Sequence, residues 1–182
     1  MTIGVLTYFF EIVFKYCKIL KAILIISLNN QKKGNRRGGV GVFFGDNDTR
    51  NISIPLKESD NNKVTNQVTE LLACIKGIET INSTSESSDC QVVIYTDSMY
   101  VVNMMTKWAI NWEKNNWTKS DGKIVDNLEL VKKLYSYSQI GNILFKHVRS
   151  HMKEPNKNDP TYKIWYGNDK ADKLAVAAAQ SL

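Results

Sequence analysis

The chain has 182 residues, about the length of one domain. Hydrophobic residues make up 43% of it and charged residues 23%, which excludes a wholly disordered chain and supplies enough apolar mass for a core. The formal net charge of +6 favours a polyanionic partner. The three cysteines, Cys17, Cys74 and Cys90, form no C-x-x-C pair, which excludes a disulfide framework and a multi-cysteine zinc module. We therefore expect an intracellular protein of the nucleus or the cytoplasm.

The first 27 residues are more apolar than the rest, with 19 apolar residues among them. Four charges interrupt this run, at Glu11, Lys15, Lys18 and Lys21. A membrane-spanning helix is therefore not expected, and the spacing of the charges by three and four residues is typical of an amphipathic helix. We interpret residues 1–22 as an atypical apolar segment before a single domain at 23–182. Two alternatives stay open: a membrane tether, and sequence foreign to the domain, as at a misjoined gene start.

A buried strand and a hairpin are expected next in the sequence. The strand is Ile23–Ile26, and a basic, polar connection follows it. Gly39–Phe44 and the alternating apolar residues of 52–56 are the two strands of the hairpin, because residues 45–48 have the chemistry of a turn.

Four helices and two further strands follow. The first helix begins at a cap formed by Thr65 or Asn66 and precedes a buried strand at Val92–Tyr95. Ile143–Val148 is the last strand, and a terminal helix begins near Asn168 after a polar loop. Apolar residues at helical spacing define the inward faces: Val68, Leu71, Leu72, Ile75 and Ile78; Val101, Met105, Trp108 and Trp112; Leu128, Val131 and Leu134; Ala171, Leu174, Ala175 and Ala178. This order predicts one mixed α/β sheet with helices on its faces.

Acidic side chains occur where an α/β sheet gathers its ligands, at the carboxyl ends of strands and in early helical turns. Glu70, Asp97 and Asp172 hold such positions, and His151 follows the last strand. Each has an ordinary structural role when taken singly, such as the stabilisation of a helix N-terminus or the start of a turn. Together they are the set that a two-metal phosphodiesterase site requires, because Mg²⁺ prefers oxygen ligands and binds phosphates.

Several motifs that occur in order over residues 38–180 resemble those of the ribonuclease H type 1 family, which cuts the RNA strand of RNA–DNA hybrids. They are GGVGVFFG at 38–45, TNQ with Glu70 at 65–70, YTDS at 95–98, a tryptophan- and lysine-bearing stretch at 108–117, HVRSH at 147–151 and NDKAD at 168–172. Each motif is weak alone, but their shared order is specific. The resemblance implies an RNase H-like fold, a five-stranded mixed sheet flanked by helices, and the activity of a hybrid-specific endonuclease.

The resemblance also implies roles for individual residues. Glu70, Asp97 and Asp172 match metal-binding carboxylates of a two-ion Mg²⁺ site, in which Mn²⁺ can replace Mg²⁺, and His151 matches a residue that shuttles a proton or assists product release. The implied hybrid-binding residues are Asn30, Lys63, Thr65, Asn66, Gln67, Trp108, Trp112 and Asn127. For the tryptophans, packing in the core at helical spacing is the alternative. We expect an RNA–DNA hybrid as the partner, no small-molecule cofactor, and a monomer.

The sequence departs from the family at the end of the first strand, where the family carries an aspartate that bridges both metal ions. No Asp or Glu occurs between Glu11 and Asp46, and the hydroxyl of Ser27 cannot replace a bridging carboxylate. Lesser departures are Ser150 in place of glycine, Asp169 in place of glutamate and a long loop at 152–166. Three interpretations follow: a hybrid endonuclease with impaired activity, a hybrid-binding protein on an inactive nuclease scaffold, and a misjoined sequence of an active enzyme.

Overall fold

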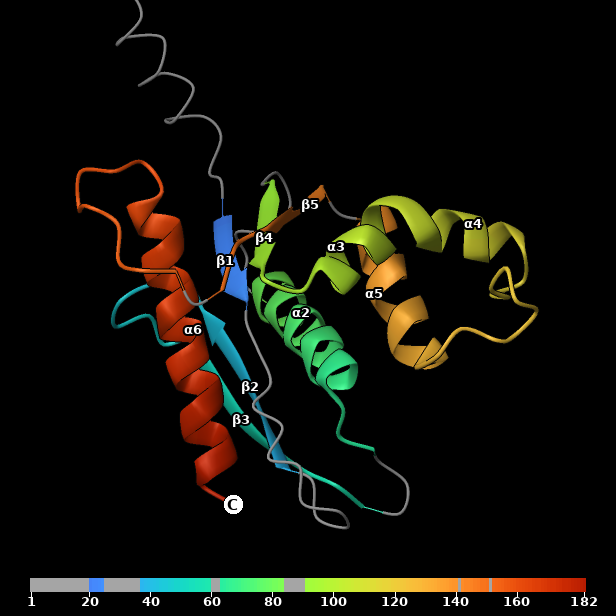
Figure 1. Cartoon of the computed structure of the whole chain (residues 1–182), viewed down its shortest axis with the longest axis horizontal. Helices are drawn as coiled ribbons and strands as arrows, with labels where there is room; N and C mark the ends of the chain where they lie inside the picture. The colour runs from blue at the N-terminus through green and yellow to red at the C-terminus, as the bar shows by residue number, and fades with distance from the viewer. Residues whose placement is uncertain (1–19, 25–36, 60–62, 84–90, 141, 151) are drawn as a thin grey trace, which may run out of the picture.

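A single mixed sheet of five strands organises the protein (Figure 1). The computed structural model describes residues 20–24, 37–59, 63–83, 91–140, 142–150 and 152–182. The strands are β1 (Leu20–Leu24), β2 (Arg37–Phe43), β3 (Ile52–Lys57), β4 (Val92–Thr96) and β5 (Ile143–His147). They lie in the order β3-β2-β1-β4-β5, with β1 antiparallel to β2 and parallel to β4, and β5 parallel to β4. The predicted five-stranded mixed sheet is confirmed.

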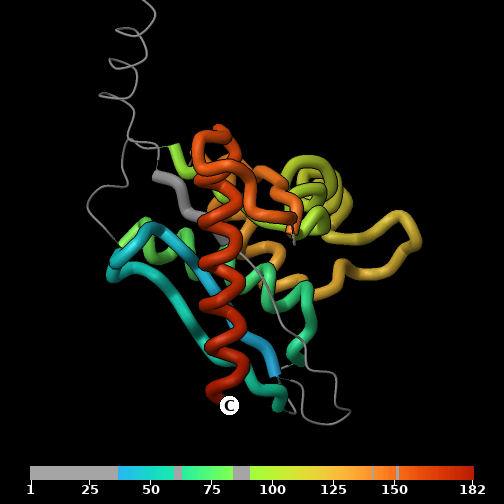
Figure 2. The backbone as a smooth tube through the Cα atoms, turned by 60° about the vertical axis from the view of Figure 1, so that its left-hand side comes forward, coloured from blue at the N-terminus to red at the C-terminus, as the bar shows by residue number. Residues whose placement is uncertain are grey.

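Helices cover both faces of the sheet. The long helix α6 (Tyr162–Gln180) lies across β2 and β3 on one face, as Figure 2 shows. The opposite face carries α2 (Asn66–Asn82), α3 (Met99–Asn103), a π-helical turn η1 (Met104–Trp108), α4 (Ala109–Lys114) and α5 (Leu128–Ile140). The main core lies between α2, α5 and the sheet. Within the described ranges, no helix combines the length and the apolar composition that crossing a bilayer requires.

Glycines of β2 allow α6 to lie directly on the strand backbone. A Cβ added at Gly39 would stand 1.9 Å from the carbonyl oxygen of Ala175, and one at Gly41 would stand 2.1 Å from that of Ala171. No side chain fits in that space. The glycine-rich strand therefore fixes the distance of α6 from the sheet, and with it the position of Asp172, the residue that follows Ala171.

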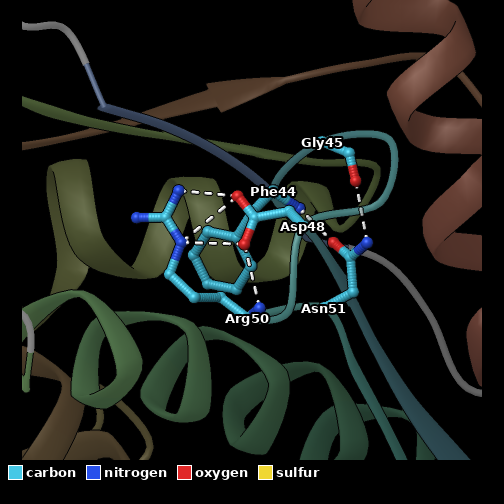
Figure 3. A network of polar contacts seen from close by, with 5 residues as sticks. All are labelled: Phe44, Gly45, Asp48, Arg50 and Asn51. Carbon is cyan, nitrogen blue, oxygen red and sulfur yellow. Dashed lines mark hydrogen bonds and ion pairs between the residues drawn. The ribbon is translucent and has the colours of Figure 1, made fainter.

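The turn between β2 and β3 is held by side chains (Figure 3). The backbone N–H of Phe44 donates to Asn51 Oδ1 at 2.8 Å, and Asn51 Nδ2 donates to the carbonyl of Gly45 at 2.8 Å. Arg50 donates to both carboxylate oxygens of Asp48, at 2.9 and 2.6 Å, and lies 5.2 Å from the centre of the Phe44 ring. These hydrogen bonds from Arg50 lower the pKa of Asp48. The predicted turn is confirmed, and its polar network stabilises the hairpin.

The helix α2 follows the prediction closely. Thr65 is the cap, since its Oγ1 accepts the backbone N–H of Val68 at 3.2 Å. Leu71, Ile75 and Ile78 are fully buried against the sheet. This orientation leaves Glu70, the fifth residue of the helix, half-buried beside the carboxyl end of β4.

Two predicted boundaries are wrong. The helix α6 begins at Tyr162, six residues before Asn168, because aromatic contacts extend it: Tyr162 stacks on Tyr166 at 6.0 Å, and Trp165 Nε1 donates to the carbonyl of Met152 at 3.0 Å. Asp172 therefore lies in the middle of the helix and not near its start. The strand β1 begins at Leu20 and not at residue 23, and residues 25 and 26 lie outside the described part of the chain.

The predicted apolar stripe after β4 is also partly wrong. The π-helical turn η1 inserts an extra residue, since the N–H of Ala109 donates to the carbonyl of Met104, five residues earlier. Met104 is fully buried three residues after Val101, and the wider turn then buries Ala109, so that Met105 is half-buried and Trp108 is 36% exposed. A prediction based on a regular α-helical period cannot anticipate the rotation of the helix face that the π-helical turn causes.

Candidate active site

Two carboxylates from separate elements act on a third, Asp97, at the carboxyl end of β4. Glu70 comes from α2 on one face of the sheet, Asp172 comes from α6 on the other face, and Asp97 directly follows β4. Burial, followed by repulsion from Glu70 and then from Asp172, raises the pKa of Asp97 to about 6. The structure thus brings together the three acids that the sequence singled out.

Serine hydroxyls orient two of these carboxylates. Ser98 Oγ donates to Glu70 Oε2 at 2.5 Å and accepts the N–H of Val101 at 3.2 Å, so one hydroxyl caps α3 and holds Glu70. Burial raises the pKa of Glu70, and the hydrogen bond from Ser98 opposes that shift. Ser150 hydrogen-bonds to the Asp97 side chain and acts to lower its pKa. Both carboxylates are therefore held in place by neutral donors.

The sequence signals the role of Ser98 but not that of Ser150. Ser98 directly precedes a helix, which is the sequence signal of a cap. Ser150 follows β5 by three residues, and its contact with Asp97 depends on the parallel pairing of β5 with β4. The ring of His147 contributes at the same place, with Nε2 at 3.2 Å from the carbonyl oxygen of Asp97. Sequence reasoning missed the contacts of Ser150 and His147.

The donor set fits a divalent cation by its chemistry. Carboxylates that repel one another favour a bound cation, and among the described residues no cationic side chain contributes to the pKa of Asp97. A second sign is Asn168, which is 7% exposed and whose Oδ1 has no hydrogen-bond partner in the described part of the chain. Within that part, no group of three Asp, Glu, His or Cys side chains is arranged so that it could hold a metal ion as it stands. The site supplies oxygen ligands but not a preformed cage.

A sequence model of the RNase H family matches residues 27–180. The chain belongs to the RNase H family. The probable ribonuclease H of Acanthamoeba polyphaga mimivirus is 34% identical over 157 residues, which cover 86% of this chain and 64% of that protein. The ribonuclease H of Schizosaccharomyces pombe is 35% identical over 153 residues, which cover 84% of this chain and 50% of that protein. The chain thus spans about half to two thirds of the length of these relatives.

Solved structures of RNase H proteins share the fold. A type 1 RNase H with the type 2 active-site motif aligns with a TM-score of 0.63 at 24% identity, over 90% of this chain and 74% of that one. The RNase H domain of the prototype foamy virus aligns with a TM-score of 0.61 at 19% identity, over 88% of this chain and 93% of that one. The predicted RNase H-like fold is confirmed.

The first strand of this RNase H domain carries no acid in its described part, which reads LKAIL. Its last residue, Leu24, pairs with Val42, and Ile23 pairs with Tyr95, two residues before Asp97. The strand therefore leads directly to the carboxylate site. Residues 25–27, which complete the stretch where the family carries its aspartate, lie outside the described residues.

Four of the residues matched to hybrid binding lie at the N-terminus of α2. Lys63, Asn66 and Gln67 are exposed, whereas Thr65 is half-buried and uses its hydroxyl as the helix cap. Asn127 directly precedes α5 and adopts a left-handed conformation, with φ of +54°. The exposure of Lys63, Asn66 and Gln67 suits a contact surface. Asn30 and His151 lie outside the described residues.

The tryptophans lie at the edge of the core in an aromatic cluster. The ring of Trp108 lies 6.0 Å from that of Tyr100 and 5.8 Å from that of Trp112. Trp112 packs partly against the core, and Trp108 is 36% exposed. Trp108 is therefore not a core residue and is accessible to a partner, while Trp112 combines both roles.

The lysines near these tryptophans differ in their surroundings. Lys119 pairs with Asp126 at 3.0 Å, and Lys123 pairs with Asp121 at 3.6 Å. These ion pairs lie in the loop after α4. Lys107 and Lys114 are exposed on η1 and α4. The charge most available to a polyanion on this surface therefore belongs to Lys107 and Lys114.

Proposed function

We propose that this chain is a ribonuclease H domain that hydrolyses the RNA strand of RNA–DNA hybrids with the help of Mg²⁺, and that the lack of an acid in its first strand keeps this activity low. The observation that carries the proposal is the repulsion of the Asp97 carboxylate by Glu70 and by Asp172, three acids that come from three elements. Relatives named ribonuclease H, at 34% and 35% identity, support it.

Glu70, Asp97 and Asp172 would hold Mg²⁺, or Mn²⁺ in its place. Such an ion supplies an activated water and neutralises charge on the scissile phosphate when it is bound. Ser98 keeps Glu70 turned toward the site, and Ser150 does the same for Asp97. With a pKa of about 6, Asp97 is mainly ionised at pH 7.5, so its carboxylate is available as a ligand.

Recognition of the hybrid would begin at the N-terminus of α2. The amides of Asn66 and Gln67 are exposed there and can donate and accept hydrogen bonds in a minor groove, where RNA displays its 2′-hydroxyls. Lys63 and Asn127 would hold a DNA phosphate, and Trp108 would pack along the DNA strand beside it. The 2′-hydroxyl contacts supply the preference for a strand of RNA.

The missing acid limits the reaction for an electrostatic reason. Two dications held about 4 Å apart repel each other strongly, and anionic ligands between them offset that repulsion. Glu70, Asp97 and Asp172 would hold one ion, and a second ion would bind poorly without the charge of a further acid. Loss of one electrostatic element of an active site commonly costs about 10²–10³ in rate. We expect at least that loss here relative to a family member with the aspartate.

The same missing acid supports a second candidate, a hybrid-binding protein without useful activity. A cleavage assay on a labelled RNA–DNA hybrid with Mg²⁺ separates the two, with duplex DNA and duplex RNA as substrate controls. We expect preferential binding of the hybrid and slow cleavage that Asp97→Asn abolishes. Preferential binding with cleavage no faster than that of Asp97→Asn would favour the second candidate. Equal binding of all three duplexes would contradict both.

We further propose that the domain acts as a monomer inside the cell, in the nucleus or the cytoplasm. The absence of a C-x-x-C pair among the three cysteines of the sequence supports a reducing location. Light scattering of the purified chain and imaging of a tagged chain in cells test these two expectations.

A further inference from the structure

A buried oxygen on α6 has no use in the fold as described. Asn168 is 7% exposed, and its Oδ1 finds no hydrogen-bond partner in the described residues. A buried amide oxygen left unpaired destabilises a protein, and such an atom in a native structure points to a bound water, ion or ligand. Its neighbours on the helix, Ala171 and Ala175, are apolar and fully buried, so an apolar side chain would suit this face better.

The position of Asn168 places this oxygen beside the carboxylate site. Asn168 precedes Asp172 by four residues in α6, so their Cβ atoms lie about 5–6 Å apart on the same side of the helix. Ala171 lies between them in the sequence and abuts the backbone of Gly41, so this side of α6 faces the sheet. The carboxylate of Asp172 in turn repels that of Asp97. The orphan oxygen and the acids thus belong to one region.

We propose that Oδ1 of Asn168 is an additional oxygen of the divalent-cation site, bound to the ion or to one of its waters next to Asp172; this inference rests on the proposed function. Amide oxygens are hard donors of the kind that Mg²⁺ and Mn²⁺ accept. A neutral oxygen adds a contact to the cation without adding to the repulsion among the three carboxylates. It cannot replace the charge of the missing aspartate.

Binding of Mn²⁺ to the whole chain without nucleic acid tests this inference, with free Mn²⁺ measured by electron paramagnetic resonance. Asn168→Leu keeps the size of the side chain and removes the oxygen, so we expect the Kd for Mn²⁺ to rise about tenfold or more. The thermal midpoint without metal should stay or rise by about 2–4 °C, because an unpaired buried oxygen is gone. Asn168→Asp should bind Mn²⁺ more tightly, and its midpoint without metal should fall and recover when Mn²⁺ is added.

Two control variants on α6 calibrate the measurement. Asp172→Asn should weaken Mn²⁺ binding, since it removes a ligand. Asp169→Asn removes a charge beside Asn168 that is paired with Lys173 at 2.6 Å, and should leave the Kd nearly unchanged.

Each contrary result has a distinct meaning. Equal Kd values for the native chain and Asn168→Leu would overturn the inference and leave the proposed function standing. An Asn168→Leu chain that unfolds or melts lower without metal would show that the oxygen has a partner within the protein, and would overturn the inference too. So would weaker binding by Asn168→Asp. If the native chain bound no Mn²⁺ at all, the metal dependence in the proposed function would itself be contradicted.

Discussion

Replacing Gly41 with alanine should separate α6 from the sheet. The new Cβ would stand 2.1 Å from the carbonyl oxygen of Ala171, and the next contact, the backbone nitrogen of Ala175, is at 2.7 Å. Ordinary contacts begin near 3.4 Å, so the helix must retreat by about 1.3 Å. The obstructing atoms belong to the backbone, which no side-chain rotation can relieve.

The size of the effect follows from the packing that the helix loses. Overpacking a core costs about 1–3 kcal/mol, and a clash with helix backbone belongs at the upper end of that range. For a protein of this size, 1 kcal/mol corresponds to about 2–4 °C in the thermal midpoint, so we expect Gly41→Ala to melt about 6–12 °C lower. The retreat also carries Asp172 away from Asp97, and a displacement of about 1 Å can reduce a reaction rate about 10²-fold.

Thermal unfolding followed by circular dichroism measures this effect, and Gly45→Ala is the matched control in the same hairpin. An added Cβ at Gly45 has its nearest neighbour at 3.8 Å, so its midpoint should change by about 2 °C at most. Hybrid cleavage by the two variants gives a second readout. If Gly41→Ala melted within 2 °C of Gly45→Ala, the close approach of α6 to β2 would be refuted.

Three further predictions concern charge. Burial and repulsion raise the pKa of Asp97 above its unfolded value, so ionisation of this residue destabilises the fold as pH rises through about 6. Without metal, Asp97→Asn should therefore melt about 2–4 °C higher than the native chain at pH 7 and show no gain at pH 4. Hydrogen bonds from Lys133 and Lys76 lower the pKa of Glu79 to about 2, so the stabilisation by this carboxylate is present above about pH 4.5 and lost as pH falls toward 2. Glu79→Gln should melt about 1–2 °C lower at pH 7, a small effect because the ion pair with Lys133 is partly exposed. A loss that persisted at pH 2 would contradict this origin. Replacing Lys107 and Lys114 together with alanine should reduce the salt dependence of hybrid binding by about two phosphate contacts, and an unchanged slope would show that this surface does not touch the hybrid.

The sequence predicted the elements whose signals are local. The face of α2 was correct because Leu71, Ile75 and Ile78 repeat with the helical period and Thr65 is a strong cap. The turn at residues 45–48 was correct because its residues carry turn chemistry. In both cases one stretch of chain contains all the information needed.

Prediction from the sequence failed where contacts between residues far apart in the chain determine the structure. The first turns of α6 are stabilised by Tyr166 and Trp165 through contacts with Asp46 and with Met152, which no local pattern contains. The π-helical turn that exposes Trp108 is equally invisible to a regular period. At the site, the acids were found from strand ends and motifs, whereas the contact of Ser150 and the buried oxygen of Asn168 emerge from the packing of separate elements.

We propose that Glu70, Asp97 and Asp172 form a hybrid-cleaving metal site that lacks one acid from the first strand. Aspartate placed singly at Leu24, Ile25, Ile26 and Ser27 should restore that acid, and the readout is Mg²⁺-dependent cleavage of an RNA–DNA hybrid. One of the four variants should cleave about 10²-fold faster than the native chain or more, and adding Asp97→Asn to that variant should abolish the gain. Fast cleavage by the native chain that Asp97→Asn abolishes, with no gain from any of the four, would contradict the claim and show that another group supplies the charge.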